Sequence, residues 1–289
     1  MKFGVMAPYQ LAPLETGEYA AAFGRLVEEL GFESVWTVEH HVMCVEYQSV
    51  YPYSHNGRSP FAADTVQPDP LIWLSYLAAA TQRLRLATGI LILPFRNPVV
   101  LAKTLASLDR ISGGRLLLGI GVGWVREEAE ALGVDFSMRG RRADEYIEVM
   151  RTLWREPVAS FHGEFVNFDG VVSEPRPAQQ GGVPIIVGGH SEAAARRAGR
   201  LGNGFYPLGV APERLASLRR IMEETAREHG RDPAKIEITC VGQPTAESAE
   251  FCAGQGVDRM VFFPRKGDLD ALRRSLEAFR RDVSEEFAS

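Results

Sequence analysis

Short apolar segments rich in β-branched residues alternate with amphipathic helical segments from one end of the chain to the other. The first helical segment illustrates the pattern, because Phe23, Leu26, Val27 and Leu30 occupy positions i, i+3, i+4 and i+7. Gly31 follows and ends that helix, since glycine tolerates the left-handed conformation common after a helix C-terminus. Strict alternation of strands and helices predicts a parallel sheet covered by helices.

Eight strands are predicted, and a helix follows each of them. The strands cover residues 3–7, 34–38, 84–93, 115–120, 183–187, 204–206, 236–241 and 259–263. The count of eight favours a closed barrel over an open Rossmann-type sheet, and one such barrel typically takes about 250 residues. The chain has 289 residues and no linker, repeat or low-complexity segment. We therefore predict a single α/β domain over residues 1–289, a (β/α)8 TIM barrel.

The stretch between the fourth and fifth strands departs from the alternating pattern. Residues 125–154 favour helix with an interruption near Gly133, and residues 155–182 are irregular, with several prolines and paired glycines. We predict that residues 155–182 form an insertion packed on the barrel, with a short hairpin over residues 160–168.

Charge and hydropathy argue against several classes of partner. A formal net charge of −5 argues against nucleic acid, because phosphate binding needs a clustered positive face. No uninterrupted apolar run of about 18 residues is present, so no membrane span is expected. The N-terminal strand also lacks the regions of a signal peptide. Cys44, Cys240 and Cys252 are odd in number and unrelated in spacing, which suits a reducing cytosol. We expect a cytoplasmic protein that acts on a small molecule.

Active sites of such barrels lie at the C-terminal ends of the strands. The second strand ends in Val38-Glu39-His40-His41. A metal site is one interpretation, but adjacent residues on an extended chain point to opposite sides, and no further ligand pattern completes the site. Proton transfer suits these residues better, since histidine titrates near neutrality and a nearby carboxylate fixes its tautomer. The remaining alternative is that they only hold the following loop by hydrogen bonds.

Glycines follow the fourth strand, in the sequence Gly119-Ile120-Gly121-Val122-Gly123-Trp124. This is not a dinucleotide fingerprint, because Trp124 stands where a glycine is required. The glycines allow a flat ligand to approach the backbone closely, or they serve only as a turn.

The fifth strand ends in Val187-Gly188-Gly189-His190-Ser191, directly before a helix. Free backbone N–H groups at a helix N-terminus, with Ser191 able to cap, favour an anion such as phosphate. A plain capping turn is the alternative. The segment has no Walker lysine, which argues against a nucleotide triphosphatase.

A long loop, residues 40–69, follows the second strand. Loops of this length are usually functional or disordered. Its aromatic residues, which include Tyr47, Tyr51 and Tyr53, indicate a wall for an apolar substrate. Packing on the protein surface explains them equally well.

Three stretches, residues 32–46, 84–132 and 184–207, resemble the luciferase-like flavin monooxygenase superfamily, and within it the F420-dependent oxidoreductases. The most specific stretch reads Ala-Thr-Gly-Ile-Leu-Ile-Leu-Pro over residues 87–94 and continues to the Gly-Gly-Arg at 113–115. The resemblance implies a flavin-type cofactor at the end of the barrel. It points to the deazaflavin coenzyme F420, with FMN as the alternative.

The resemblance also implies roles for individual residues. In similar proteins the cofactor ring lies against a non-prolyl cis peptide after the third strand, which by position is Gly89-Ile90 here. Glu39 and His40 would flank the reactive face of the ring. The residues lining the ring or its ribityl chain would be Gly121, Val122 and Gly123, and those holding the phosphate would be Gly188, Gly189, His190 and Ser191.

Trp124 stands where some F420-dependent enzymes carry a carboxylate, so any acid role would belong to Glu39, His40 or His41. The residues expected to face the substrate are His41, Tyr51, Tyr53 and Trp124.

The predicted reaction is hydride transfer between the deazaflavin and a small organic substrate. His40 would donate or accept the proton, and Glu39 would orient His40. An FMN-dependent monooxygenase is the alternative on the same barrel, and a non-catalytic cofactor carrier is another. Because related proteins are commonly dimers, the resemblance also implies a homodimer.

Overall fold

The computed structural model describes residues 1–283. Parallel strands form one sheet in the order β3-β2-β1-β11-β10-β9-β8-β5, and pairing of β3 with β5 closes it. These strands are β1 (Lys2–Met6), β2 (Ser34–Thr37), β3 (Arg85–Thr88), β5 (Leu116–Gly121), β8 (Ile185–Gly188), β9 (Gly204–Tyr206), β10 (Glu237–Val241) and β11 (Arg259–Phe262). The predicted TIM barrel is therefore confirmed.

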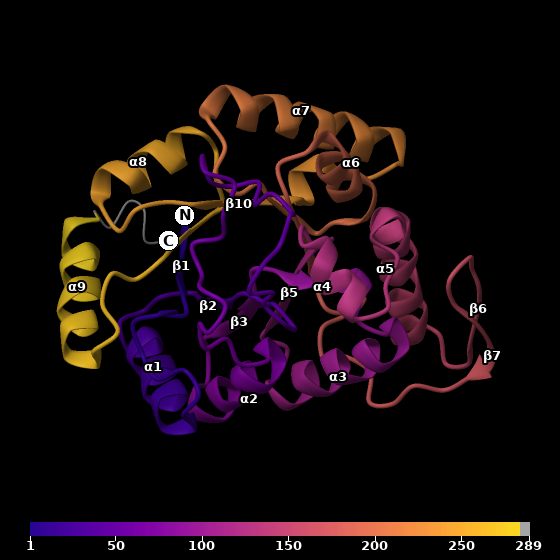
Figure 1. The fold of residues 1–289 in the computed structure, drawn as a ribbon, viewed down its shortest axis with the longest axis horizontal. Helices are drawn as coiled ribbons and strands as arrows, with labels where there is room; N and C mark the ends of the chain where they lie inside the picture. Colours follow the sequence, from indigo (N-terminus) through magenta and orange to yellow (C-terminus); the bar gives the residue numbers. More distant parts are fainter. Residues whose placement is uncertain (284–289) are drawn as a thin grey trace.

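Helices surround the barrel on all sides (Figure 1). The ring consists of α1 (Gly17–Glu29), α2 (Pro70–Ala80), α3 (Pro98–Ile111), α5 (Arg139–Arg155), α6 (Glu192–Leu201), α7 (Pro212–Glu228), α8 (Ala246–Gly254) and α9 (Leu269–Asp282). Short 3-10 helices are η1 (Leu93–Phe95), η2 (Phe136–Met138) and η3 (Pro233–Lys235). Within residues 1–283, no helix has the length and apolar character that crossing a membrane requires.

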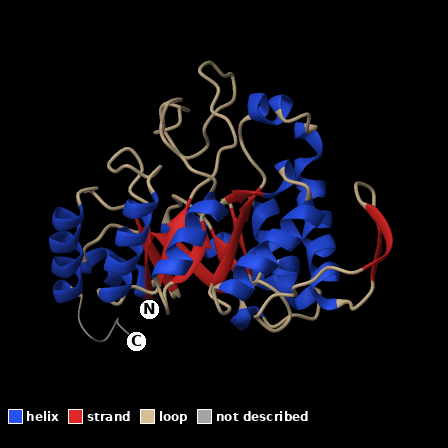
Figure 2. Cartoon of the chain, turned by 90° about the horizontal axis from the view of Figure 1, so that it is seen from below, coloured by secondary structure: helices blue, strands red, loops and turns tan. Residues whose placement is uncertain are grey.

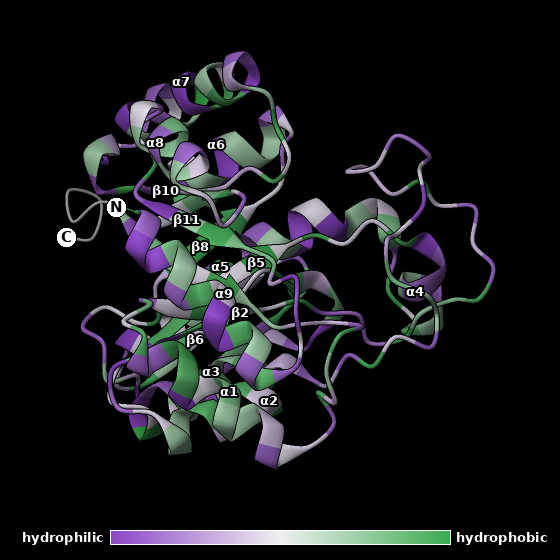
Figure 3. Cartoon of the chain, turned by 90° about the vertical axis from the view of Figure 1, so that its left-hand side faces the viewer, coloured by the Kyte–Doolittle hydropathy of each residue, from purple (hydrophilic) through white to green (hydrophobic). Residues whose placement is uncertain are grey.

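The strands are apolar and buried, because they face the barrel interior on one side and the helices on the other. In Figure 3 the barrel strands are accordingly mostly green, and the outer helices show many purple residues. Side-chain oxygens cap several helices, as Asp69 caps α2 and Asn97 caps α3. These caps fix where each helix starts at the end of the barrel.

The third predicted strand, residues 84–93, is interrupted. It divides into β3 and the short β4 (Leu91–Ile92), and the peptide between Gly89 and Ile90 is cis, as predicted. Ala87 pairs with Leu117, and Leu91 pairs with Ile120. Between these two pairs the chain advances four residues from β3 to β4 but only three residues along β5. The extra residue makes a bulge that turns the chain at the barrel end.

The segment between β5 and β8 contains two helices and a hairpin. Helix α4 (Arg126–Ala131) ends before Gly133, whose φ of +67° breaks the helical region as predicted. Strands β6 (Ala159–His162) and β7 (Asn167–Val171) pair in the antiparallel sense, which confirms the predicted hairpin. The hairpin lies at the edge of the molecule beside α5 rather than on the barrel strands (Figure 1). Glu145 of α5 holds it there by accepting hydrogen bonds from the backbone of Phe165 and Val166.

Loops gather at the end of the barrel opposite the N-terminus, where the strands end (Figure 2). We call this end the barrel mouth. Helix α4 lies among these loops and not in the outer helical ring (Figure 3). The mouth is therefore built from the long loop after β2, the bulge after β3 and the segment after β5.

Candidate cofactor and substrate site

A cavity of about 930 Å³ opens at the barrel mouth. Of the residues predicted for the site, those lining this cavity are Glu39, His40, Tyr51, Tyr53, Gly89, Ile90, Gly121, Val122, Gly123, Trp124, Gly188, Gly189, His190 and Ser191. The ends of strands far apart in sequence thus meet around one hollow, which is large enough for a cofactor-sized ligand. His41 lies outside the lining formed by the described residues.

The side chain of Ile90 lies on the wall of this cavity between β5 and β8. A Cβ atom added at Gly121 would lie 2.6 Å from Cδ1 of Ile90, and one added at Gly188 would lie 2.6 Å from Cγ2 of Ile90. These two glycines were predicted to let a ligand approach the backbone. The structure shows that they make room first for Ile90, so the bulge and both glycines form one packed unit.

His40 forms its hydrogen bond with a carboxylate that the sequence analysis did not select. Nδ1 of His40 lies 2.8 Å from Oε2 of Glu128, a fully buried residue of α4. Burial raises the pKa of Glu128, but hydrogen bonds from His40 and His41 outweigh it and lower the pKa to about 2. An ionised carboxylate only accepts, so Nδ1 carries the proton. Nε2 of His40 has no hydrogen-bond partner among residues 1–283 and remains available at the cavity.

Glu39 does not orient His40, contrary to the prediction. Its carboxylate accepts a hydrogen bond from the backbone N–H of Ile92 at 2.6 Å and pairs with Arg96, whose Nε lies 2.8 Å from Oε1. Arg96 also pairs with Asp69, the N-cap of α2. Glu39 is only 4% exposed, so this ion pair compensates a charge that would otherwise be costly to bury. Glu39 therefore ties the end of β2 to the bulge.

His41 lies behind the cavity wall, between two carboxylates. Its Nε2 is 3.9 Å from Glu39 and its Nδ1 is 3.7 Å from Glu128. The neighbouring Glu128 raises the pKa of His41, against an opposing effect of burial. The predicted contact of His41 with substrate is thus not supported by its position, because successive side chains at the end of β2 point in different directions.

Two adjacent carboxylates of α4 hold the long loop. Glu128 accepts from the backbone N–H of His41 at 2.6 Å, near the start of the loop. Glu127 accepts from the backbone of Gln48 and Ser49, and from Oγ of Ser49 at 2.6 Å. The structural interpretation of the Glu39–His41 segment therefore also holds in part, since hydrogen bonds at His41 do position this loop.

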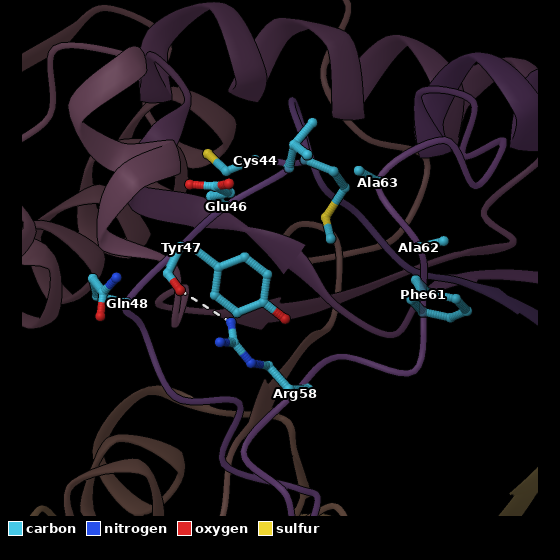
Figure 4. A pocket seen from close by; sticks show the side chains of 10 residues that line it. Cys44, Glu46, Tyr47, Gln48, Arg58, Phe61, Ala62 and Ala63 are labelled. Atoms are coloured by element: carbon cyan, nitrogen blue, oxygen red, sulfur yellow. Dashed lines mark hydrogen bonds between the residues drawn. The ribbon is translucent and has the colours of Figure 1, made fainter.

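The loop also encloses a smaller cavity of about 440 Å³. Tyr47 and Arg58 lie at its centre in Figure 4, where Nη1 of Arg58 donates to the backbone oxygen of Tyr47 at 3.0 Å. The Arg58 guanidinium also lies 4.8 Å from the centre of the Tyr47 ring. Phe61 lines both cavities, so the loop forms the partition between them.

Aromatic rings form a continuous chain across the barrel mouth. Trp124 lies edge-on to His40 and Tyr51, with centroid separations of 5.9 and 5.0 Å. Tyr51 contacts Tyr53 at 5.3 Å, and Tyr53 contacts His190 at 4.8 Å. We call these five residues the aromatic chain. It joins the ends of β2, β5 and β8, and burial raises the pKa of Tyr53 to about 12, so its hydroxyl stays neutral.

Two helix N-termini and two arginines meet at one side of the cavity. Ser191 caps α6 by accepting from Ala194, and the start of α5 contributes Arg139 and Gly140. Arg197 of α6 donates from Nη2 to the Gly140 oxygen at 3.0 Å and pairs with Asp144. We call Arg139, Gly140, Ser191, Ala194 and Arg197 the anion corner. Helix N-termini and guanidinium groups both favour a phosphate.

Among residues 1–283, three buried polar atoms of residues that line the cavity have no hydrogen-bond partner. They are the hydroxyl of Tyr206, Nδ1 of His190 and Nε of Arg139, and all three residues line the cavity. Buried polar groups are normally hydrogen-bonded, so such atoms mark places where a ligand donates or accepts. Within the described residues, no group of three or more metal-ligating side chains comes together.

Three residues of the site were not predicted from the sequence, namely Glu128, Arg139 and Arg197. A usable signal existed for Glu128, because the first turn of a helix that follows a barrel strand faces the mouth. Arg139 and Arg197 carry no such signal, since each belongs to an amphipathic helix with several other arginines.

Fold and site together define a barrel with a histidine–carboxylate pair, a cis-peptide bulge and an anion corner around one cofactor-sized cavity. The sequence matches the luciferase-like monooxygenase family over residues 1–280, and the chain belongs to that family. The chain is an oxidoreductase, so the alternative of a non-catalytic cofactor carrier is wrong.

One relative and two solved structures are similar to this protein over most of the chain. An F420-dependent glucose-6-phosphate dehydrogenase of Kineococcus radiotolerans is 31% identical over 239 residues, covering 79% of this chain and 64% of that protein. Two solved structures share the fold. A monooxygenase from Streptomyces bottropensis has a TM-score of 0.80 at 23% identity, covering 99% of this chain and 100% of that one. An F420-dependent secondary alcohol dehydrogenase, in complex with an F420-acetone adduct, has a TM-score of 0.76 at 19% identity, covering 100% and 99%.

Proposed function

We propose that this protein is an F420-dependent oxidoreductase that transfers a hydride between the deazaflavin and a small organic substrate. The observation that carries the proposal is the His40–Glu128 pair, which presents an unpartnered Nε2 to a cavity beside the bulge. The 31% identical relative from Kineococcus is named as F420-dependent, which supports the choice of cofactor.

The residues present fit such a cofactor. The anion corner offers two helix N-termini and two arginines to a phosphate. The bulge at Gly89-Ile90, with the Ile90 side chain packed against Gly121 and Gly188, offers an apolar wall to a flat ring. The unpartnered hydroxyl of Tyr206 and Nδ1 of His190 offer hydrogen bonds.

When bound, the deazaflavin supplies hydride transfer at carbon five. His40 would take up or release the accompanying proton at Nε2. Glu128 would hold the ring in the tautomer with Nδ1–H and stabilise the imidazolium that forms when Nε2 gains the proton. The aromatic chain would exclude water from this group and provide an apolar wall for the substrate.

A titration of the purified protein with F420 and, separately, with FMN tests the cofactor assignment. We expect cofactor fluorescence to report tight, saturable binding of F420 and much weaker binding of FMN. Tight binding of FMN alone would overturn the proposal. It would favour the FMN-dependent monooxygenase, the alternative supported by the family's description and by the Streptomyces monooxygenase.

Replacement of His40 tests the proton-transfer role separately. His40→Ala should lower turnover by about 10²- to 10⁴-fold while cofactor affinity stays close to that of the wild type. Unchanged turnover would remove His40 from the reaction.

A further inference from the structure

Two arginines stack on Phe136 at the outer edge of the anion corner, while a third, Arg142, stacks on Phe165 and donates from Nη1 to the Tyr146 hydroxyl at 3.0 Å. The guanidinium carbon of Arg139 lies 3.7 Å from the Phe136 ring centre, and that of Arg126 lies 4.7 Å from it. Arg142 follows Arg139 by three residues on α5, so the two occupy neighbouring positions on one helix face. We call Arg126, Arg139 and Arg142 the arginine cluster.

In the part of the chain that the structure describes, no carboxylate forms a direct ion pair with the arginine cluster. Within residues 1–283, no acidic oxygen lies within 4.0 Å of its guanidinium nitrogens, whereas the nearby Arg141 pairs with Glu164 and Arg200 with Asp144. Asp135 accepts hydrogen bonds from Ser137, and these together with the nearby charges of Arg142 and Arg126 lower the pKa of its carboxyl. The cluster therefore concentrates unpaired positive charge.

Two members of the cluster also have unsatisfied hydrogen-bonding groups. Nη1 of Arg139 donates to the Phe136 oxygen at 2.7 Å and Nη1 of Arg142 to the Tyr146 hydroxyl, but the buried Nε atoms of both arginines have no hydrogen-bond partner among residues 1–283. Burial and, after it, the positive charge of Arg126 lower the pKa of Arg139. A guanidinium group matches carboxylate and phosphate oxygens in two-point contacts, so an anion would satisfy both the charge and the donors.

The cluster continues the anion corner toward solvent. Arg139 and Phe136 line the large cavity, and the next residue, Gly140, accepts the hydrogen bond from Arg197 at 3.0 Å. Arg126 is exposed at the outer end, at the start of α4. A ligand whose phosphate occupied the anion corner would extend past the arginine cluster as it left the cavity.

We propose that the arginine cluster binds a second anionic group of the cofactor, the carboxylates of the F420 tail. This inference rests on the proposed function. F420 continues beyond its phosphate into a chain of carboxylates, whereas FMN ends at the phosphate, so the cluster would favour F420 over FMN. A substrate anion has the same chemistry, and the experiment must separate the two sources.

The test is equilibrium binding, followed by cofactor fluorescence at low and high salt. The ligands are F420 and the deazaflavin riboside that lacks both phosphate and tail. The variants are Arg126→Gln and Arg142→Gln, with Arg141→Gln as the matched control because Arg141 already pairs with Glu164. A third ligand, glucose 6-phosphate, is titrated onto the F420-loaded protein to report an anionic substrate.

Each cluster variant should weaken F420 binding about fivefold at low salt, and the effect should shrink at high salt. Binding of the riboside and the behaviour of Arg141→Gln should match the wild type. Equal loss of F420 and riboside affinity would indicate a general structural effect and overturn the inference.

Two further outcomes are informative. If F420 affinity is unchanged in the cluster variants while glucose 6-phosphate binding depends on Arg126, the cluster serves a substrate and the tail assignment is wrong. If the wild type binds neither F420 nor the riboside, the proposed function itself fails. Equal affinity of the wild type for F420 and riboside overturns the role of the cluster and also the phosphate contact of the anion corner.

Discussion

His40 Nδ1 and Glu128 Oε2 lie 2.8 Å apart, although 88 residues separate them in the sequence. One partner follows β2 and the other lies on α4 after β5, so closure of the barrel brings them together. Glu128 also accepts from the backbone of His41, and this second contact fixes the carboxylate against rotation. The pair therefore sets both the tautomer and the direction of the imidazole at the cavity.

Replacement of Glu128 should impair turnover more than cofactor binding. In Glu128→Gln the neutral amide neither selects the Nδ1–H tautomer nor stabilises the imidazolium, so turnover should fall by about 10- to 100-fold, less than in His40→Ala. The pH profile of turnover should also shift, which a purely structural defect would not produce. The exposed Glu130 on the same helix provides the control, and Glu130→Gln should behave as the wild type.

The same carboxylate should make stability depend on pH in the acid range. The pKa of Glu128 is lowered from 4.5 to about 2 in the folded protein. Its contribution is therefore fully present above pH 4.5 and is lost as the pH falls toward 2. It is on the order of 3 kcal/mol at neutral pH. Urea unfolding of the wild type and Glu128→Gln should show a difference at pH 7 that narrows between pH 4.5 and 2. If the difference in unfolding free energy stays constant across this pH range, the pKa of Glu128 is not lowered in the folded protein.

Arg96 should be essential for stability because it compensates the buried charge of Glu39. Arg96→Gln leaves that carboxylate without its cation and should lower the free energy of unfolding by about 3 to 5 kcal/mol. The double variant Glu39→Gln/Arg96→Gln should recover part of this loss. Thermal unfolding measures both, and equal stability of single and double variants would show that the pair is not coupled.

The packing of Ile90 against Gly121 should be visible as a non-additive pair of substitutions. Gly121→Ala places a Cβ atom 2.6 Å from Cδ1 of Ile90 and should cost about 1 to 3 kcal/mol. Shortening Ile90 in the double variant Gly121→Ala/Ile90→Ala should remove that overlap. Chemical unfolding of the two single variants and the double variant gives the interaction term. If the stability lost in the double variant equals the sum of the losses in the two single variants, the two residues do not constrain one another.

Much of the site could be predicted because it follows from position along the barrel strands. Gly121 is the last residue of β5, His40 and Ser191 each lie three residues beyond the end of a strand, and all parallel strands end at one edge. The cis peptide at Gly89-Ile90 was predicted from resemblance, and the structure confirms its position. The division of residues 84–93 into β3 and β4 was missed, because an apolar run has the same pattern with or without a bulge.

The sequence by itself determined the eight alternating units, the barrel and the strand ends that line the cavity, since these depend on local periodicity and on order along the chain. Only the tertiary structure decided which carboxylate serves His40. Glu39 is adjacent in sequence but pairs with Arg96, while Glu128 reaches the imidazole from α4. Side-chain pairing depends on distances across the barrel, and neighbours on a strand end point in different directions. For the same reason the approach of Arg126 and Arg139 to Phe136 depends on the tertiary structure, in which α4 and α5 both contact η2.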